Sequence, residues 1–254
     1  MSMDKSLYSM IFKRKSFHLF RNIGKEQITS NEIEDIYSAY ENFVSLYPDI
    51  KTAIKIVPTK DTTCKRGQEF CILMYSEIKD NYLQNIGYIG EQLDLYLVSK
   101  NIGTLWFGIG KTNEPAYENL EFVIMIAISK VDDEKKFRKD MFKSKRKAKE
   151  EIWIGEEISN IADIVRFAPS ACNSQPWIVE HCNDTLQVFR YKKPGKRGIM
   201  PANKVSYYNR MDIGIFLCFL ELSLEHNNIN FEREDFTDKG LDDEKTLVAV
   251  YHLN

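Results

Sequence analysis

The sequence predicts an α+β fold of two tandem, pseudo-symmetric units, with central helices flanked by sheets. Three observations predict it. Similar residues recur at a nearly constant spacing, as where Glu32-Ile33 returns as Glu157-Ile158, and 157 − 32 = 125. Patterns typical of helices and strands follow in the same order in both halves. Each half also holds one long helix that is apolar on most faces, which is the pattern of a buried helix.

Each half is expected to contain a helix, two strands, the long helix and a last strand. In the first half these elements are expected at 30–46, 52–57, 69–75, 82–101 and 121–129. In the second half they are expected at 156–167, 177–182, 186–191, 207–226 and 246–253. Thr29, Ser30 or Asn31 can cap the first helix. The long helices are expected to pack on each other, and Ile89-Gly90 returns as Ile213-Gly214 at a spacing of 124.

A repeat of this length indicates a domain duplication rather than a solenoid. Its usual physical meaning is a fused dimer, in which an interface between two copies has become internal. The charged connector at 130–150 is the natural boundary, which gives a first half at 1–133 and a second half at 134–254. We therefore expect a monomer that is an internal pseudo-dimer.

The composition is that of a globular protein and excludes several functional classes. Hydrophobic residues make up 43% and the net charge is -2, so no overall charge attracts nucleic acid. The start of the sequence lacks the apolar core of a signal peptide, and the apolar stretch 211–224 is too short to span a bilayer. The five cysteines form no CxxC pair and the four histidines lack ligand spacing. We expect a cytoplasmic protein that binds no metal, membrane or nucleic acid.

A loop at 168–177, Ala-Pro-Ser-Ala-Cys-Asn-Ser-Gln-Pro-Trp, is the most informative motif. Pro169 stops the preceding helix, and Ser170 and Asn173 supply hydrogen bonds. From these residues alone, a loop that ends a helix and leads into a strand is the favoured interpretation. The motif also resembles the Ala-Pro-Ser-x-x-Asn-x-Gln-Pro-Trp signature of the nitroreductase-like FMN-dependent flavoproteins.

Two further motifs carry the same resemblance. Residues 14–20, Arg-Lys-Ser-Phe-His-Leu-Phe, resemble the family's N-terminal Arg-Arg-Ser-(aliphatic)-Arg/Lys-x-Phe element. Residues 103–110, Gly-Thr-Leu-Trp-Phe-Gly-Ile-Gly, are similar to the Gly-Thr-x-Trp-x-Gly-Gly turn that follows its central helix. The two halves together resemble the TM nitroreductase branch, in which two nitroreductase-like units are fused in one chain.

The resemblance implies an FMN phosphate site on two basic segments. Arg14 and Ser16 would face the phosphate and ribityl chain with Lys15 beside them, and Lys136 and Arg138 would also bind phosphate. A guanidinium fork suits phosphate oxygens. Taken alone, 13–15 would be a solvated basic turn and 135–149 a solvated connector, since charge runs usually are.

The resemblance also implies which residues surround the flavin ring. Phe107, Gly108 and Ile109 would lie against the isoalloxazine, with a backbone N–H near Gly108 donating to N5, because glycine allows close backbone approach. The alternative for this segment is a helix C-cap turn using Gly103 or Gly110. From the second half, the residues Pro169, Ser170, Ala171 and Asn173 would complete the site. Asn173 and Gln175 are expected mainly to fix the loop, and Trp177 to lie in the core.

One residue departs from the family pattern, and each half lacks the motifs that the other half supplies. The family has a second basic residue near flavin N1/O2 where this sequence has His18, which carries a charge only when protonated. A reciprocal site would need the Pro-Ser-x-x-Asn loop at 44–48, which reads Val-Ser-Leu-Tyr-Pro, and a basic pair beyond Asn254. We therefore expect one FMN per chain at the interface of the two halves.

The function implied is an FMN-dependent oxidoreductase of nitroreductase type. Hydride would pass from NADH or NADPH through flavin N5 to a small electron-poor acceptor, nitroaromatic or quinone-like, in a ping-pong cycle. The flavin carries out the chemistry, so no side chain is assigned as catalytic acid or base. The alternative is a non-catalytic FMN-binding or flavin-sensing protein, which His18 and the divergence of the second half favour.

Overall fold

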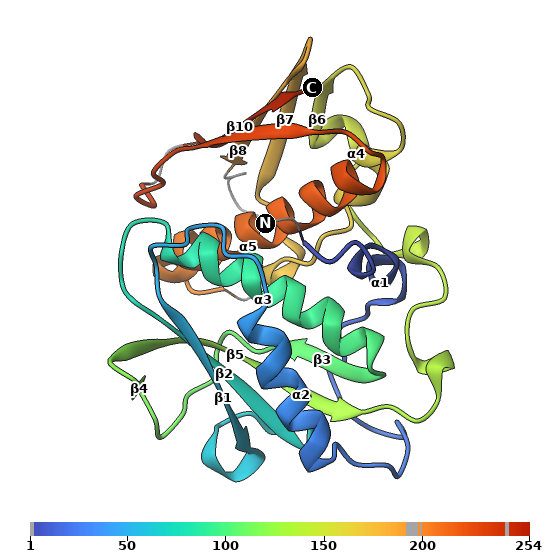
Figure 1. Ribbon diagram of the computed structural model, residues 1–254, viewed down its shortest axis with the longest axis vertical. Coiled ribbons are helices and arrows are strands. Elements are labelled where there is room, and N and C mark those ends of the chain that lie inside the picture. The colour runs from blue at the N-terminus through green and yellow to red at the C-terminus, as the bar shows by residue number, and fades with distance from the viewer. Residues whose placement is uncertain (1–2, 192–197, 199, 242–243) are drawn as a thin grey trace. The chain divides into compact units, whose positions relative to one another are not determined.

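The computed structural model describes residues 3–191, 198, 200–241 and 244–254, and confirms the predicted α+β class. The chain forms two compact units (Figure 1). The first unit comprises 1–82 and 89–141, and the second comprises 83–88 and 142–254. The main division thus falls a few residues after the predicted boundary at 133/134.

The first unit is built on an antiparallel sheet of strand order β1-β2-β5-β3, with β4 paired to β5 (Figure 1). Its elements are α1 (Leu7–Lys13), α2 (Ser30–Glu41), β1 (Thr52–Pro58), β2 (Phe70–Ser76), β3 (Ile102–Trp106), β4 (Ala116–Tyr117) and β5 (Leu120–Lys130). The central strands β2 and β5 are nearly continuous apolar runs and are almost completely buried. They form the core of this unit.

Helix α2 begins as predicted and ends earlier. Thr29 accepts a hydrogen bond from the Glu32 backbone, and the Glu32 carboxylate accepts one from the Thr29 backbone, so a capping box starts the helix. The helix ends at Glu41 rather than at 46. Pro48 follows shortly after, and a proline cannot continue the hydrogen-bonded ladder.

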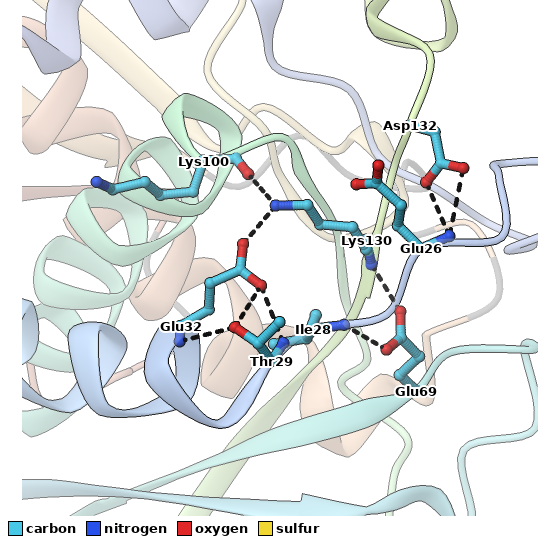
Figure 2. A network of polar contacts seen from close by, with 8 residues as sticks. All are labelled: Glu26, Ile28, Thr29, Glu32, Glu69, Lys100, Lys130 and Asp132. Carbon is cyan, nitrogen blue, oxygen red and sulfur yellow. Dashed lines mark hydrogen bonds and ion pairs between the residues drawn. The ribbon is translucent and has the colours of Figure 1, made fainter.

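Carboxylates tie the segment before α2 to the end of β5 (Figure 2). Glu69 accepts hydrogen bonds from the backbones of Ile28 and Lys130, at 2.7 and 2.8 Å. Asp132 accepts from the backbone of Glu26, and the Lys130 ammonium binds Glu32. Because side chains satisfy these backbone donors, the loop is held without belonging to the sheet.

The second unit is built on a sheet of order β6-β7-β8-β10-β9, in which only the β6–β7 pair is parallel. Its elements are β6 (Trp153–Gly155), α4 (Ile161–Val165), β7 (Trp177–Cys182), β8 (Thr185–Tyr191), α5 (Val205–His226), β9 (Phe231–Asp235) and β10 (Lys245–Leu253). Trp177 is fully buried and stacks on Phe216 at 4.9 Å, so its predicted place in the core is confirmed.

The helix predicted at 156–167 is much shorter than expected. Ser159 has a left-handed backbone, with a φ of 46°, so no helix can pass through it. Only Ile161–Val165 is helical. Five further elements, α1, β3, β4, β6 and β9, were not predicted, because they are short or their residues are typical of turns.

The two sheets share a strand order. The path β1-β2-β5-β3 of the first unit matches β7-β8-β10-β9 of the second. The predicted positions of the first, second and last strands of each half are confirmed to within a residue or two. The match in topology is therefore independent of the residue matches in the sequence.

The first turns of α3 (Tyr82–Ser99) belong to the second unit, where they pack on α5. A methyl group built on Gly87 would lie 2.0 Å from the carbonyl oxygen of Met211, and one on Gly214 would lie 1.9 Å from that of Gln84. The contacts are reciprocal, since 214 − 87 = 127 and 211 − 84 = 127. The predicted packing of the long helices is confirmed for these turns.

This reciprocity corrects the predicted register of the two helices. Gly214 corresponds to Gly87, and not to Gly90 as the spacing of 124 suggested. Gly90 instead faces Trp106 inside the first unit, where an added methyl would lie 2.5 Å from the indole ring. Short apolar pairs such as Ile-Gly recur too often in buried helices to fix a register.

No helix in the described part of the chain is long and apolar enough to cross a membrane.

Candidate functional site

The two basic segments predicted to bind phosphate lie together in the first unit. The Arg138 backbone N–H donates to the carbonyl of Lys13 at 3.0 Å, and Lys15 Nζ donates to the carbonyl of Lys136 at 2.9 Å. Helix α1 ends at Lys13, and Arg14 turns the chain into an extended conformation. The two segments, which carry four cationic residues, are thereby brought together: Arg14, Lys15, Lys136 and Arg138.

The next residues run beside β3. Ser16 forms a parallel bridge with Thr104, and the Phe17 backbone donates to the Thr104 carbonyl at 2.9 Å. Phe17 is buried, and its ring packs edge-on against Phe137 at 5.3 Å. This packing fixes the spacing of the two basic segments. His18 is exposed.

Arg14 is buried in a cluster of polar groups on α3. Its Nε and Nη2 both lie 2.8 Å from Asp94 Oδ2, and Nε lies 3.2 Å from Glu91 Oε1. Asp94 also accepts from the Thr104 hydroxyl at 2.6 Å and the Trp106 indole at 2.9 Å. Burial alone would lower the pKa of Arg14, but the two carboxyl groups raise it above its usual value.

Asp94 is the main counter-charge of Arg14. Burial raises the pKa of Glu91 well above its usual value, against the attraction of Arg14, so its neutral form is favoured. Neither Glu91 oxygen has a hydrogen bond to the described residues. The carboxylate charge in this cluster is therefore neutralised by Arg14.

Arg138 is a partly buried cation next to this cluster. Burial first, and then repulsion from Arg14, lower its pKa to about 10. No carboxylate within the described ranges lies within ion-pair distance of it. Asp94 and Glu91 attract Arg138 from a distance but do not outweigh its burial and the repulsion from Arg14. A bound anion would offset this desolvation.

The predicted turn at 103–110 is only partly a turn. Residues Ile102–Trp106 form β3, which pairs with β5, and α3 ends at Ser99 with Asn101 in the left-handed region. The C-cap interpretation of Gly103 is therefore wrong, because asparagine takes the left-handed position that a C-cap glycine usually fills. The turn proper is 107–110, closed by a hydrogen bond from the Gly110 N–H to the Phe107 carbonyl at 3.2 Å.

The turn leaves an accessible apolar surface. Phe107 and Gly108 are partly exposed, and Ile109 is 62% exposed. The Arg66 guanidinium lies over the Phe107 ring at 5.6 Å. Sequence reasoning missed Arg66, because it stands in a loop between β1 and β2 with no motif around it.

In the second unit, the loop at 169–175 is held by its own hydrogen bonds. Ser170 Oγ accepts from the Gln175 backbone at 3.0 Å, and Asn173 Nδ2 donates to the Lys145 carbonyl at 3.1 Å. Gln175 Oε1 accepts from the Lys147 backbone at 2.8 Å. Cys172 has a φ of 52° and is exposed. The loop therefore has a defined shape that these side chains maintain.

Asp212 of α5 holds this loop through two hydrogen bonds. Its carboxylate accepts from the Ala171 N–H at 2.9 Å and from the Ser174 hydroxyl at 3.3 Å. Burial raises the pKa of Asp212 to about 7, although both hydrogen bonds oppose the rise. Because Asp212 ionises first in the unfolded state, the folded protein loses stability as the pH rises from 3.8, the usual pKa of the group, to about 7.

We expect Asp212→Asn to remove this pH dependence. The difference in unfolding free energy between the variant and the wild type should grow by about 3 kcal/mol in favour of the variant between about pH 5 and about pH 8. Urea denaturation at both values measures it. A difference that does not change with pH would show that Asp212 ionises normally in the folded protein.

A known protein family matches the part of the chain that holds these residues. The family described as "Putative TM nitroreductase" matches residues 6–224. The chain belongs to this family. The match includes every residue from Arg14 to Asn173 that the sequence analysis assigned to the cofactor. A comparison with curated protein sequences gives no match.

Solved structures show the fold of this nitroreductase-family chain. A "putative nitroreductase" of Thermotoga maritima is similar over 100% of this chain and 93% of its own, with 18% identity and a TM-score of 0.63. A "putative nitroreductase" of Desulfovibrio desulfuricans, solved in complex with FMN, is similar over 62% of this chain and 100% of its own, with 14% identity and a TM-score of 0.44. The first shows that the nitroreductase-like fold extends over the whole chain.

Proposed function

We propose that this chain is an FMN-dependent oxidoreductase that takes hydride from NADH or NADPH and passes it to a small electron-poor acceptor, nitroaromatic or quinone-like. The observation that carries the proposal is that the two predicted phosphate motifs, which hold four cationic residues, lie together, with Arg138 partly desolvated and in no ion pair among the described residues. When bound, the flavin would supply the hydride chemistry, and the protein would supply binding and electrostatics.

The phosphate end of the cofactor would be held by Lys15, Lys136 and Arg138, with Ser16 beside them. Arg14 has a different part in this proposal. Its Nε and Nη2 are bound to Asp94, which leaves Nη1 to reach the phosphate while the rest of the guanidinium holds the segment in place. A planar group fixed on one edge is pre-organised for a second hydrogen bond on the other.

The ring end would lie against Phe107, Gly108 and Ile109. Their exposure supports this, and the Arg66 guanidinium over the Phe107 ring offers a cation beside them. A fixed positive charge near the ring would stabilise the reduced, anionic flavin. The contribution of Pro169, Ser170, Ala171 and Asn173 from the second unit stays a prediction of the resemblance.

We further infer that the units are diverged copies and that only one flavin binds per chain. The shared strand order and the reciprocal glycine contacts support the duplication. At the same spacing of 127, Glu221 corresponds to Asp94 and Arg233 to Trp106. Glu221 is bound by Arg233 and by the hydroxyls of Tyr88 and Tyr251. The second unit therefore fills its equivalent cluster with its own side chains.

We expect the double variant Lys136→Gln/Arg138→Gln to raise the Kd for FMN at least about tenfold, because it removes two charged hydrogen-bond donors. Fluorescence titration with FMN measures it, and riboflavin, which lacks the phosphate, should bind both proteins equally. Lys139→Gln, an exposed neighbour in the same connector, is the control. An unchanged Kd in the double variant would rule out this phosphate site.

The activity is tested by following NADH absorbance with flavin-loaded protein and a quinone. Oxidation well above the rate with free FMN supports the enzyme. Bound flavin without such oxidation would instead favour the non-catalytic FMN-binding protein.

A further inference from the structure

Two cysteines of the first unit are buried near each other, at the edge of its hydrophobic core where two polar side chains reach them. Cys64 and Cys71 have no exposed surface and belong to one hydrophobic cluster with Phe20 and Leu73. Cys64 lies in the loop that connects β1 to β2, and Cys71 is the second residue of β2. Neither cysteine is among the residues that the proposed function assigns to the flavin.

Donor groups surround the sulfur of Cys71. The Gln68 amide donates to Cys71 Sγ at 3.5 Å, and the Thr62 hydroxyl lies 3.5 Å from the same atom. Both side chains are themselves buried, each 6% exposed. Gln68 is held by a second bond to the Cys64 carbonyl at 2.7 Å, so its amide is fixed in position. Donors directed at a sulfur stabilise its thiolate form.

The pKa values of the two thiols are shifted in opposite directions. The Cys64 thiol and the Gln68 amide, which donates to Cys71 Sγ, lower the pKa of Cys71 against the effect of burial. The hydrogen bond with Cys71, followed by burial, raises the pKa of Cys64. A nucleophilic thiolate with a neighbouring thiol is the arrangement of a redox-reactive pair.

We propose that Cys64 and Cys71 form a redox-active dithiol that a hydroperoxide oxidises to a disulfide when the loop that carries Cys64 opens locally. The Cys71 thiolate attacks a peroxide oxygen, the O–O bond breaks, and Cys71 becomes a sulfenic acid as hydroxide leaves and takes up a proton. Cys64 then attacks that sulfur, its proton goes to the departing hydroxyl, and a second water is released. In total, two thiols and one hydrogen peroxide give one disulfide and two waters.

The loop gives this oxidation a consequence at the proposed flavin turn. Thr63 is bound to Lys111 through backbone and side chain, at 2.9 and 2.8 Å, and Arg66 lies over Phe107. A disulfide would pull the loop toward β2 and move Arg66. This consequence rests on the proposed function, whereas the disulfide itself does not.

The test is peptide mapping of the full chain, without flavin, after treatment with hydrogen peroxide while folded. Remaining thiols are alkylated on unfolding, and trypsin should release peptides 61–65 and 67–79 joined by a disulfide that dithiothreitol cleaves. Cys218, equally buried, should be recovered alkylated as the internal control. Recovery of Cys64 and Cys71 as alkylated thiols together with Cys218 would overturn the proposal.

Two variants test the order of the steps. In Cys64→Ser, we expect Cys71 to be oxidised to sulfinic acid, because no second thiol can trap the sulfenic acid. In Cys71→Ser, Cys64 should stay a thiol at the same dose. Equal oxidation of Cys64 in the second variant would contradict the assigned roles. With FMN bound, oxidation should change flavin fluorescence, and its failure alone would reject only the coupling to the turn.

Discussion

Gly214→Ala is expected to lower the free energy of unfolding by about 2 kcal/mol or more, and Gly87→Ala should do the same. Alanine is the better helix former by about 1 kcal/mol, which would stabilise an isolated helix. The added methyl group, however, would lie 1.9 Å from the Gln84 carbonyl oxygen in one case and 2.0 Å from that of Met211 in the other. A backbone atom cannot rotate away as a side chain can, so the helices would have to separate.

Urea denaturation of each variant measures this effect. Gly103→Ala is the control, because its methyl group would meet only side-chain carbons of Phe17 and Val131, at about 3.0 Å. We expect that variant to lose clearly less stability. Glycine variants as stable as the wild type would show that α3 and α5 do not cross at these residues.

The second large effect is expected for Asp94→Ala. Removal of this carboxylate leaves Arg14, which is 3% exposed, without the partner that binds both its Nε and Nη2. Breaking a buried ion pair in this way costs about 3–5 kcal/mol. The Thr104 hydroxyl and the Trp106 indole also lose their acceptor. The free energy of unfolding, measured with urea, should fall accordingly.

A second substitution separates charge from packing. Asp94→Ala/Arg14→Met should recover a large part of the loss, because the buried charge is gone. Glu134→Ala, which breaks the exposed pair with Lys13, should leave stability nearly unchanged. If the double variant were no more stable than Asp94→Ala, the loss would come from the missing hydrogen bonds rather than from the unpaired cation.

The long elements of the fold could be predicted from the sequence because their patterns are local. The run at 70–76 is apolar and β-prone, and 205–226 is apolar on most faces, so periodicity defines both. Strand β3 was missed because its residues 102–106 carry a glycine, and their pairing with β5 is non-local. The predicted register of the two long helices was wrong for a related reason, because contacts between backbones distant in the sequence determine that register.

The candidate site shows the same division. The motif at 14–16 and the pair at 136 and 138 could be chosen from the sequence, and the structure brings them together. Asp94 and Glu91 could not be assigned to Arg14, because nothing in a buried helix tells which carboxyl group faces a distant arginine. Arg66 and the Cys64–Cys71 pair were missed similarly, since only the folded loop directs them to Phe107 and to each other.

The visible spectrum of the purified protein, reconstituted with excess FMN and freed of unbound cofactor, tests the central proposal most directly. Protein concentration from amino-acid analysis and flavin absorbance after denaturation together give the flavin-to-chain ratio. We predict one FMN per chain, lost in Lys136→Gln/Arg138→Gln. A protein that retains no flavin, or a ratio of two, would contradict it.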